Sequence, residues 1–182
     1  AIVQARTSSS RLPGKVLHPL AGEPMILREL ERIARARRLD GIVVATSEDP
    51  TDDELVVLLA DAGYDYIRGS LEDVLARYVR ALDKYQPDVA IRLTADCPLI
   101  SPKVIDLVVE RFHASSADYV SNTMNPTYPD GLDVEVLSAS ALRTVGREAI
   151  DPHEREHVTL GIYRQPERFA VENVVDPSGL DK

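Results

Sequence analysis

The stretch AIVQARTSSSRLPGK, residues 1–15, decides how the rest of the chain is interpreted. Ile2 and Val3 form a short apolar run typical of a buried strand, and small hydroxyl residues follow over positions 7–10. Small side chains let backbone N–H groups approach an anion, while Arg11 and Lys15 supply positive charge. The stretch therefore predicts a strand that opens into a phosphate-binding loop. The alternative is a polar surface loop with scattered cations, because the Gly-Lys-Ser/Thr ending of a Walker A motif is absent.

Composition narrows the class of protein. A chain of 182 residues with 44% hydrophobic and 28% charged residues fits one soluble globular domain. The formal net charge of −9 argues against a nucleic-acid-binding protein, so any phosphate site must be a local cluster of cations. No apolar run approaches the roughly 18 residues of a membrane span. The single cysteine, Cys97, excludes an internal disulfide, and we expect a cytoplasmic protein that binds no membrane.

Strand and helix patterns alternate four times along the first two thirds of the chain. Apolar runs at 2–3, 42–46, 66–69 and 89–93 predict strands, and apolar stripes at 25–34, 54–62, 71–82 and 102–112 predict helices. On the first helix, Arg28, Glu29 and Arg32 lie opposite the stripe and predict a solvated face. The segment from Ser70 to Asp73 predicts a capping box for the third helix. The alternation predicts a three-layer α/β/α fold with a mostly parallel, Rossmann-like sheet that binds ligands at its carboxyl edge.

A second motif, RLTADCPL, follows the strand expected at 89–93. Asp96 falls just past the carboxyl end of that strand, where a lone carboxylate can hold Mg²⁺ between nucleotide phosphates. The alternative is an aspartate that caps the turn into the helix beginning at Ser101 and Pro102. Cys97 is expected to be a packed residue rather than a nucleophile, since no histidine lies near it in sequence.

The pattern changes in residues 118–165. Residues 132–137 alternate apolar and acidic residues, which predicts a half-buried strand with Asp133 and Glu135 on one face. An ordinary edge strand with a solvated face is the alternative. A helix is expected over 138–149. A second helix is expected from Asp151 to Ile162, and Glu154 and His157 lie three residues apart on it. A zinc pair is not expected, because the His-Glu-x-x-His order is absent.

Four strings carry a family resemblance: Q-A-R-x-x-S-x-R-L-P-G-K, R-L-T-A-D-C-P-L, Y-P-D-G-L-D-V-E-V and E-R-E-H-V-T. They resemble the sugar nucleotidyltransferases, more narrowly the acylneuraminate and acidic-sugar cytidylyltransferases, and most closely their spore-coat polysaccharide biosynthesis branch. The resemblance implies the nucleotide-diphospho-sugar transferase fold, with a small β/α segment of the dimerisation type. It implies an enzyme of surface polysaccharide biosynthesis that joins CTP to an acidic sugar of the nonulosonic type and releases pyrophosphate. A homodimer is also implied.

The resemblance also implies roles for residues at matching positions. Arg11, Lys15 and Asp96 are the expected catalytic residues, and Asp96 is the expected ligand of a Mg²⁺ cofactor. The expected nucleotide-binding residues are Gln4, Ala5, Arg6, Ser10, Arg11, Lys15, Thr46, Arg68, Gly69, Arg92 and Thr94. The expected sugar-binding residues are Asn122, Asp130, Asp133, Glu154 and His157.

Residues 1–182 are expected to form a single nucleotidyltransferase domain, in which 118–165 contact the sugar and the dimer partner. Relatives continue beyond the position of Lys182 into a strand, a Val-Asp-Thr-Pro-Glu-Asp segment with a second metal ligand, and a closing helix. We therefore expect this chain to bind nucleotide and to turn over poorly. Three other functions stay open: a nucleotidyltransferase with another base preference, a glycosyltransferase-like enzyme, and a non-catalytic nucleotide-binding relative. Against the second, Asp96 is followed by Cys97 and not by an Asp-x-Asp motif.

Overall fold

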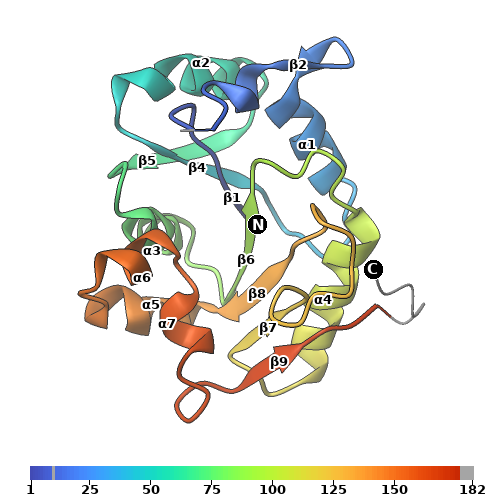
Figure 1. Ribbon diagram of the computed structural model, residues 1–182, viewed down its shortest axis with the longest axis vertical. Coiled ribbons are helices and arrows are strands. Elements are labelled where there is room, and N and C mark those ends of the chain that lie inside the picture. Colours follow the sequence, from blue (N-terminus) through green and yellow to red (C-terminus); the bar gives the residue numbers. More distant parts are fainter. Residues whose placement is uncertain (10, 177–182) are drawn as a thin grey trace.

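One seven-stranded sheet organises the molecule, and the computed structural model describes residues 1–9 and 11–176 of it. Its strands lie in the order β5-β4-β1-β6-β8-β7-β9, with β1 near the middle (Figure 1). In chain order the strands are β1 (Ile2–Gln4), β4 (Val43–Ser47), β5 (Asp65–Gly69), β6 (Val89–Thr94), β7 (Tyr119–Ser121), β8 (Glu135–Ser138) and β9 (Val171–Asn173).

The sheet is mostly parallel, as the strand–helix alternation predicts. Strand β1 pairs in parallel with β4 and β6, and β4 with β5, whereas β8 runs antiparallel to both β6 and β7. The chain moves outward from β1 through β4 to β5 and then returns to β6 on the other side of β1. The direction of winding thus reverses between β1 and β6, and in doubly wound folds ligands bind at the carboxyl ends of the strands at such a point.

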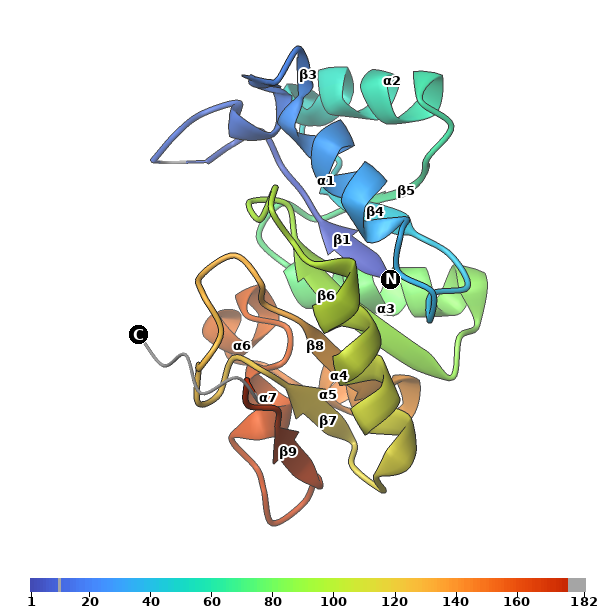
Figure 2. The ribbon, with the colours of Figure 1, turned by 90° about the vertical axis from the view of Figure 1, so that its right-hand side faces the viewer.

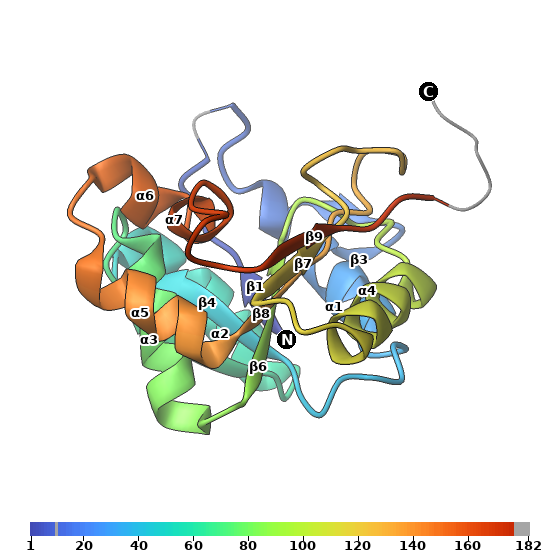
Figure 3. The ribbon, with the colours of Figure 1, turned by 90° about the horizontal axis from the view of Figure 1, so that it is seen from below.

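Helices cover both faces of the sheet (Figure 3). Buried side chains of α1 (Met25–Ile33), α2 (Asp53–Asp61) and α4 (Pro102–Ala114) pack on one face. Those of α3 (Val74–Tyr85), α5 (Ala139–Glu148) and α7 (Leu160–Tyr163) pack on the other. The short elements are η1 (Lys15–Leu17), β2 (Pro19–Leu20), β3 (Glu23–Pro24), η2 (Pro50–Asp52) and α6 (Pro152–Glu156). The three-layer α/β/α prediction is confirmed.

Polar residues begin several helices, although one predicted cap is wrong. Helix α5 begins after Ser138, whose Oγ accepts a hydrogen bond from the N–H of Ala141 at 3.2 Å. Helix α3 begins at Val74 rather than near Ser70, and its cap is Asp73, whose carboxylate accepts from the N–H of Ala76 at 2.9 Å. A short aspartate side chain reaches the free N–H groups of a first turn, which explains the shift of the helix start.

Three sequence expectations are corrected by packing. Glu29 does not lie on a solvated face, because its side chain is fully buried against the segment after β6. The helix expected from Asp151 to Ile162 is broken at Val158, whose φ of 48° lies in the left-handed region that β-branched residues rarely adopt. Strand β8 is not an edge strand, since it lies between β6 and β7 with Glu135 buried.

The fold gathers several loops on one side. Figures 2 and 3 both show the loop after β1, the loop after β6 and the segment between β7 and β8 projecting in the same direction. On one face of the sheet, α1 and α4 contact each other (Figure 2). The carboxyl edge of the sheet therefore brings together stretches that are nearly a hundred residues apart in sequence.

Candidate active site

The candidate site begins where β1, β4 and β6 end. The N–H of Ala95 donates to the carbonyl of Gln4 at 2.9 Å, and the N–H of Ala5 donates to the carbonyl of Ala45 at 3.1 Å. Strand pairing thus continues past the ends of the strands and fixes the backbone of the loop that follows β1 against that of the Asp96 segment. Both sequence motifs meet at this position.

Asp96 and Lys15 form an ion pair across this edge. Lys15 Nζ lies 3.0 Å from Asp96 Oδ2, and Thr94 Oγ1 donates to Asp96 Oδ1 at 2.7 Å. Burial works to raise the pKa of Asp96, but the hydrogen bonds from Thr94 and Lys15 and the lysine charge outweigh it and hold the pKa below its ordinary value. Asp96 is therefore an ionised carboxylate, 45% exposed, and it does not cap the helix that begins after Ser101.

The loop after β1 is anchored at its base by a buried aspartate. Asp52 Oδ1 accepts hydrogen bonds from the N–H and the hydroxyl of Thr7 at 2.7 and 2.8 Å, and Oδ2 accepts from the N–H of Ser47 at 3.1 Å and from its hydroxyl. Burial acts to raise the pKa of Asp52, yet these hydrogen bonds lower it overall. Gly14 closes the loop through a 2.7 Å bond to the carbonyl of Thr7, and its φ of 68° suits glycine.

The loop's cations differ in their surroundings. Arg11 is exposed, Lys15 is paired with Asp96, and Arg6 is half-buried beside α3. Ser10, also expected to bind nucleotide, lies outside the described residues. The geometry therefore brings Lys15 to the metal-ligand candidate and leaves Arg11 free to face solvent.

Three of the expected nucleotide-binding residues, Thr46, Arg68 and Gly69, lie at the ends of β4 and β5. Arg68 braces the loop after β4, because its guanidinium donates to the carbonyl of Ser47 at 2.8 Å and pairs with Asp53 at 2.8 Å. Thr46 is fully buried, and its hydroxyl has no hydrogen-bond partner among the described residues. A side chain at Gly69 would clash, since a Cβ there would lie 2.8 Å from Cγ of Arg77.

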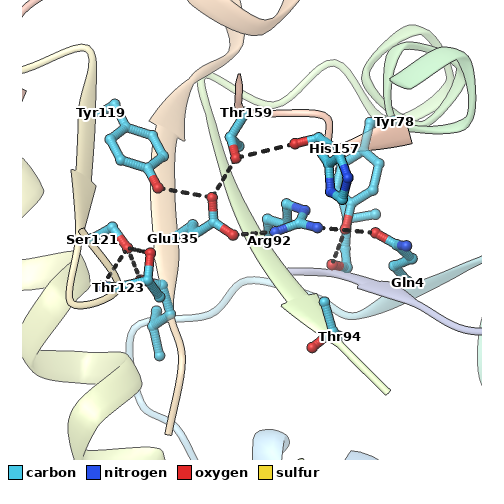
Figure 4. A network of polar contacts seen from close by, with 12 residues as sticks. Gln4, Tyr78, Arg92, Thr94, Tyr119, Ser121, Thr123, Glu135, His157 and Thr159 are labelled. Carbon is cyan, nitrogen blue, oxygen red and sulfur yellow. Dashed lines mark hydrogen bonds and ion pairs between the residues drawn. The ribbon is translucent and has the colours of Figure 1, made fainter. Parts of the chain in front are cut away.

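Arg92 belongs to a buried polar network on the α3 side of the sheet (Figure 4). Its guanidinium pairs with Glu135 and donates to Gln4 Oε1 at 3.3 Å. Glu135 also accepts hydrogen bonds from the Tyr119 hydroxyl at 2.8 Å and the Thr159 hydroxyl at 2.5 Å. The positive charge of Arg92 is thus neutralised within the chain, and the network joins β1 and β6 to the turn that carries His157.

The sugar-side candidates are only partly gathered. Asn122 is 1% exposed, and its amide holds the segment between β7 and β8 by bonds of 2.8 Å to the N–H of Val134 and the carbonyl of Leu132. Asp130 and Asp133 are exposed on that same segment.

The other two sugar-side candidates come from α6 and the turn after it. Glu154 is half-buried against Gly161, and His157 is exposed with its ring 4.3 Å from that of His153. The strained backbone at Val158 turns the chain between His157 and the Thr159 hydroxyl that bonds Glu135. The two sugar-side groups therefore lie on separate segments, and the Glu135 network links the second of them to β6.

A buried carboxyl group lies close behind Asp96. Glu29 Oε2 accepts a hydrogen bond from the N–H of Cys97 at 3.2 Å, while Oε1 has no partner among the described residues. Burial, followed by the charge of Asp96, raises the pKa of Glu29 to about 8. Burial also raises the pKa of the Cys97 thiol to about 12, which agrees with the expectation that Cys97 is a packed residue.

Four buried charged residues near the site were not predicted from the sequence: Glu29, Asp52, Arg77 and Glu135. Glu29, Asp52 and Glu135 lie in patterns that are usually solvated, such as the polar side of an amphipathic helix, a turn or an alternating strand. A charged residue inside an apolar stripe was a usable signal only for Arg77, which falls between Leu75 and Tyr78. For the others, burial depends on which elements pack together.

A hollow of about 580 Å³ lies at the opposite, amino-terminal edge of the sheet, lined by residues that include Ala1, Gly41 and Val89. It is not the candidate site, because no described residue of 4–15 or of 92–99 lines it. In parallel α/β sheets the ligand groups gather at the carboxyl ends of the strands.

The residues at the carboxyl edge fit a magnesium ion that arrives with a nucleotide. No cluster of three or more histidine, cysteine, aspartate or glutamate side chains suited to a metal occurs within residues 1–9 and 11–176. Mg²⁺ in nucleotide enzymes is commonly bound through one or two carboxylates together with substrate phosphates. The ionised, partly exposed Asp96 meets that requirement.

The doubly wound sheet, with a cationic loop after its first strand and a carboxylate after β6, places the chain among the doubly wound α/β proteins, in which ligands bind at this edge. A family model described as cytidylyltransferase matches residues 1–177, and the chain belongs to that family. The spore coat polysaccharide biosynthesis protein SpsF of Bacillus subtilis is 35% identical over 181 residues, covering 97% of this chain and 74% of its own length. The chain falls in the same branch of the sugar cytidylyltransferases as that relative.

Two further relatives agree. The 3-deoxy-manno-octulosonate cytidylyltransferase of Anaeromyxobacter sp. (strain K) is 38% identical over 112 residues, which cover 59% of this chain and 44% of that enzyme. A solved cytidylyltransferase structure from Leptospira borgpetersenii superposes with a TM-score of 0.92 at 31% identity, covering 97% of this chain and 75% of that one. None of the helices in the described part of the chain is long and apolar enough to cross a membrane.

Proposed function

We propose that this protein transfers CMP from CTP to an acidic sugar and releases pyrophosphate. The observation that carries the proposal is the pairing of Lys15 with Asp96 at the point where the winding of the sheet reverses. Membership of the cytidylyltransferase family supports the choice of CTP. The printed names of the relatives, which concern spore-coat polysaccharide and an octulosonate, support a sugar acid as acceptor.

In this proposal the protein's own groups position the reactants and balance charge. Arg11 and Lys15 bind the triphosphate, and the Asp52 anchor holds the base of their loop still. A bound Mg²⁺ would supply charge neutralisation at the phosphates and lower the pKa of a coordinated hydroxyl. Asp96 is the residue that would hold it. The sugar lies between the Asp133 segment and the His157 turn, and the protein acts as a homodimer in the cytoplasm.

The experiment that tests the proposal has two stages. Thermal unfolding is measured with CTP, UTP, ATP, GTP and dTTP, each with and without Mg²⁺. Pyrophosphate release is then measured with CTP and either 3-deoxy-manno-octulosonate or an acylneuraminate. A rise in Tm that is specific to CTP, followed by magnesium-dependent release with one sugar acid, supports the proposal. A Tm that no nucleotide changes contradicts the proposal. If CTP binds but no pyrophosphate is released with either sugar acid, the proposal is reduced to nucleotide binding.

A further inference from the structure

Arg77 is a fully buried arginine whose guanidinium has no hydrogen-bond partner in the described part of the chain. Its side chain is 0% exposed on α3, and its Nε, Nη1 and Nη2 make no hydrogen bond with any described residue. A guanidinium carries five N–H donors and stays protonated in proteins. Burying such a group without hydrogen bonds or a counter-ion is strongly unfavourable. We therefore expect Arg77 to have a role other than stabilising the unliganded fold.

The two nearest carboxylates do not compensate Arg77 by contact. Asp52 is already held by the loop after β1 and by β4, and Asp73 accepts hydrogen bonds from its own helix and from Arg155. Burial lowers the pKa of Arg77, and the like charge of the nearby Arg6 acts in the same direction. Arg6 and Arg77 therefore lie near each other, and no carboxylate among the described residues forms a hydrogen bond with Arg77.

The position of Arg77 indicates what the charge serves. Its stem lies against Gly69, the last residue of β5, where any larger residue would displace it. Its charged neighbours, Arg6 and Asp52, follow β1 and β4. The guanidinium is thus enclosed beneath the carboxyl ends of three parallel strands, behind the loop that carries Arg11 and Lys15.

We propose that Arg77 is a specificity-determining residue that favours polyphosphate over uncharged nucleoside through its buried positive charge. The inference rests on the proposed function and adds to it a cation outside the two sequence motifs. A charge in the low-dielectric interior is screened little by salt, so it acts over distances at which a surface lysine does not. It requires no contact between Arg77 and the ligand. It also explains how an acidic chain of net charge −9 attracts a triphosphate.

The test compares Arg77→Met, which keeps an unbranched stem and removes the charge, with Arg77→Lys, which keeps a cationic group whose pKa burial lowers. Binding of CTP, pyrophosphate and cytidine to the whole chain is measured by calorimetry at pH 6.5, and the Tm of each unliganded variant is recorded. We expect R77M to bind CTP and pyrophosphate about tenfold more weakly and cytidine as well as the wild type does. Because burial lowers the pKa of a lysine, we expect R77K to lose affinity for CTP and pyrophosphate by a smaller factor than R77M does. We expect unliganded R77M to melt at or above the wild-type Tm.

Several results would overturn the inference. Unchanged affinity of R77M for CTP and pyrophosphate would show that the charge is not felt at the site. An equal loss for cytidine would make Arg77 a residue that shapes the pocket. If R77M does not fold, R77Q is measured in the same way, and failure of both variants to fold would assign Arg77 to stability alone. A wild-type chain that binds neither CTP nor pyrophosphate would remove the proposed function together with this inference, whereas normal wild-type binding with unchanged R77M removes the inference only.

Discussion

Lys15 Nζ and Asp96 Oδ2 lie 3.0 Å apart, although 81 positions separate the two residues in sequence. Each group satisfies the other before any ligand is bound. A metal ion at Asp96 would compete with Lys15 for the carboxylate and release the ammonium group toward phosphate. Binding of metal and of nucleotide at this pair should therefore be coupled.

The first prediction concerns this pair. Asp96→Asn should abolish the part of CTP binding that depends on Mg²⁺, whereas Lys15→Ala should weaken CTP binding with and without the metal. Neither variant should change the free energy of unfolding by more than about 1 kcal/mol, because exposed ion pairs contribute little. Titration calorimetry with and without Mg²⁺ measures the first effect, and urea unfolding measures the second.

The control is Glu110→Gln, which breaks a more exposed ion pair, that with Arg38 on the α1–α4 side of the molecule. It should leave CTP binding unchanged at both magnesium concentrations. Identical losses in Asp96→Asn with and without Mg²⁺ would contradict the assignment of the metal to this carboxylate.

The second prediction concerns Glu29 and pH. Its pKa is about 8 in the folded protein, against an ordinary value of 4.5, because burial disfavours the charged form. Between pH 4.5 and pH 8, Glu29 keeps its proton in the folded protein and loses it in the unfolded chain. The contribution of Glu29 to the free energy of unfolding is therefore fully present below pH 4.5 and is lost as the pH rises to 8. The amide in Glu29→Gln has no proton to lose in this range. The free energy of unfolding of the variant minus that of the wild type should therefore increase by about 2–4 kcal/mol between pH 5 and pH 8.

Urea unfolding at a series of pH values measures this difference. Glu31→Gln, an exposed position on the same helix, serves as the control and should show no such trend. A constant difference between Glu29→Gln and wild type across the range would show that Glu29 is ionised in the folded protein.

The third prediction concerns Glu135. Glu135→Gln leaves the buried Arg92 without its counter-charge and sets an amide nitrogen against the donors from Tyr119 and Thr159. We expect a loss of about 3–5 kcal/mol in the free energy of unfolding. Replacing both partners, in R92Q with E135Q, should recover part of it, because no unpaired charge remains. Glu48→Gln, which breaks an exposed pair with Arg80, should cost less than about 1 kcal/mol.

The fourth prediction concerns the thiol of Cys97. With a pKa of about 12 instead of 9, and with the residue only 8% exposed, its thiolate fraction at pH 8 is lower by about a thousandfold. Reaction with a disulfide reagent should therefore be slow in the native protein and fast in urea. A native rate equal to the unfolded rate would contradict both the burial of Cys97 and its exclusion as a nucleophile.

Local pattern was enough to predict the class of fold and the edge of the sheet at which Lys15 and Asp96 lie, whereas the roles expected for these two residues came from the family resemblance. Alternating strand and helix periodicities imply a parallel sheet, and a parallel sheet places its loops at one edge, so the loop of Lys15 and the strand end of Asp96 were expected to meet. The strand–helix order and the three layers follow from the same argument. These features depend on the spacing of apolar residues, which is visible in the sequence.

Tertiary structure decided which charged residues are buried. Glu29 lies on the side of α1 that the sequence predicts to be solvated, but packing of α1 against the Asp96 segment buries it. Glu135 alternates with apolar residues as an exposed strand residue would, but β8 lies between β6 and β7 and Glu135 is buried. The break at Val158 and the enclosure of Arg77 likewise depend on contacts between distant elements. The sequence by itself determined at which edge of the sheet the two motifs lie, because alternating strand and helix periodicities imply parallel strands whose carboxyl ends share one edge. Only the tertiary structure decided which charged residues are buried near that edge, because the desolvation of a side chain depends on all the elements that pack around it.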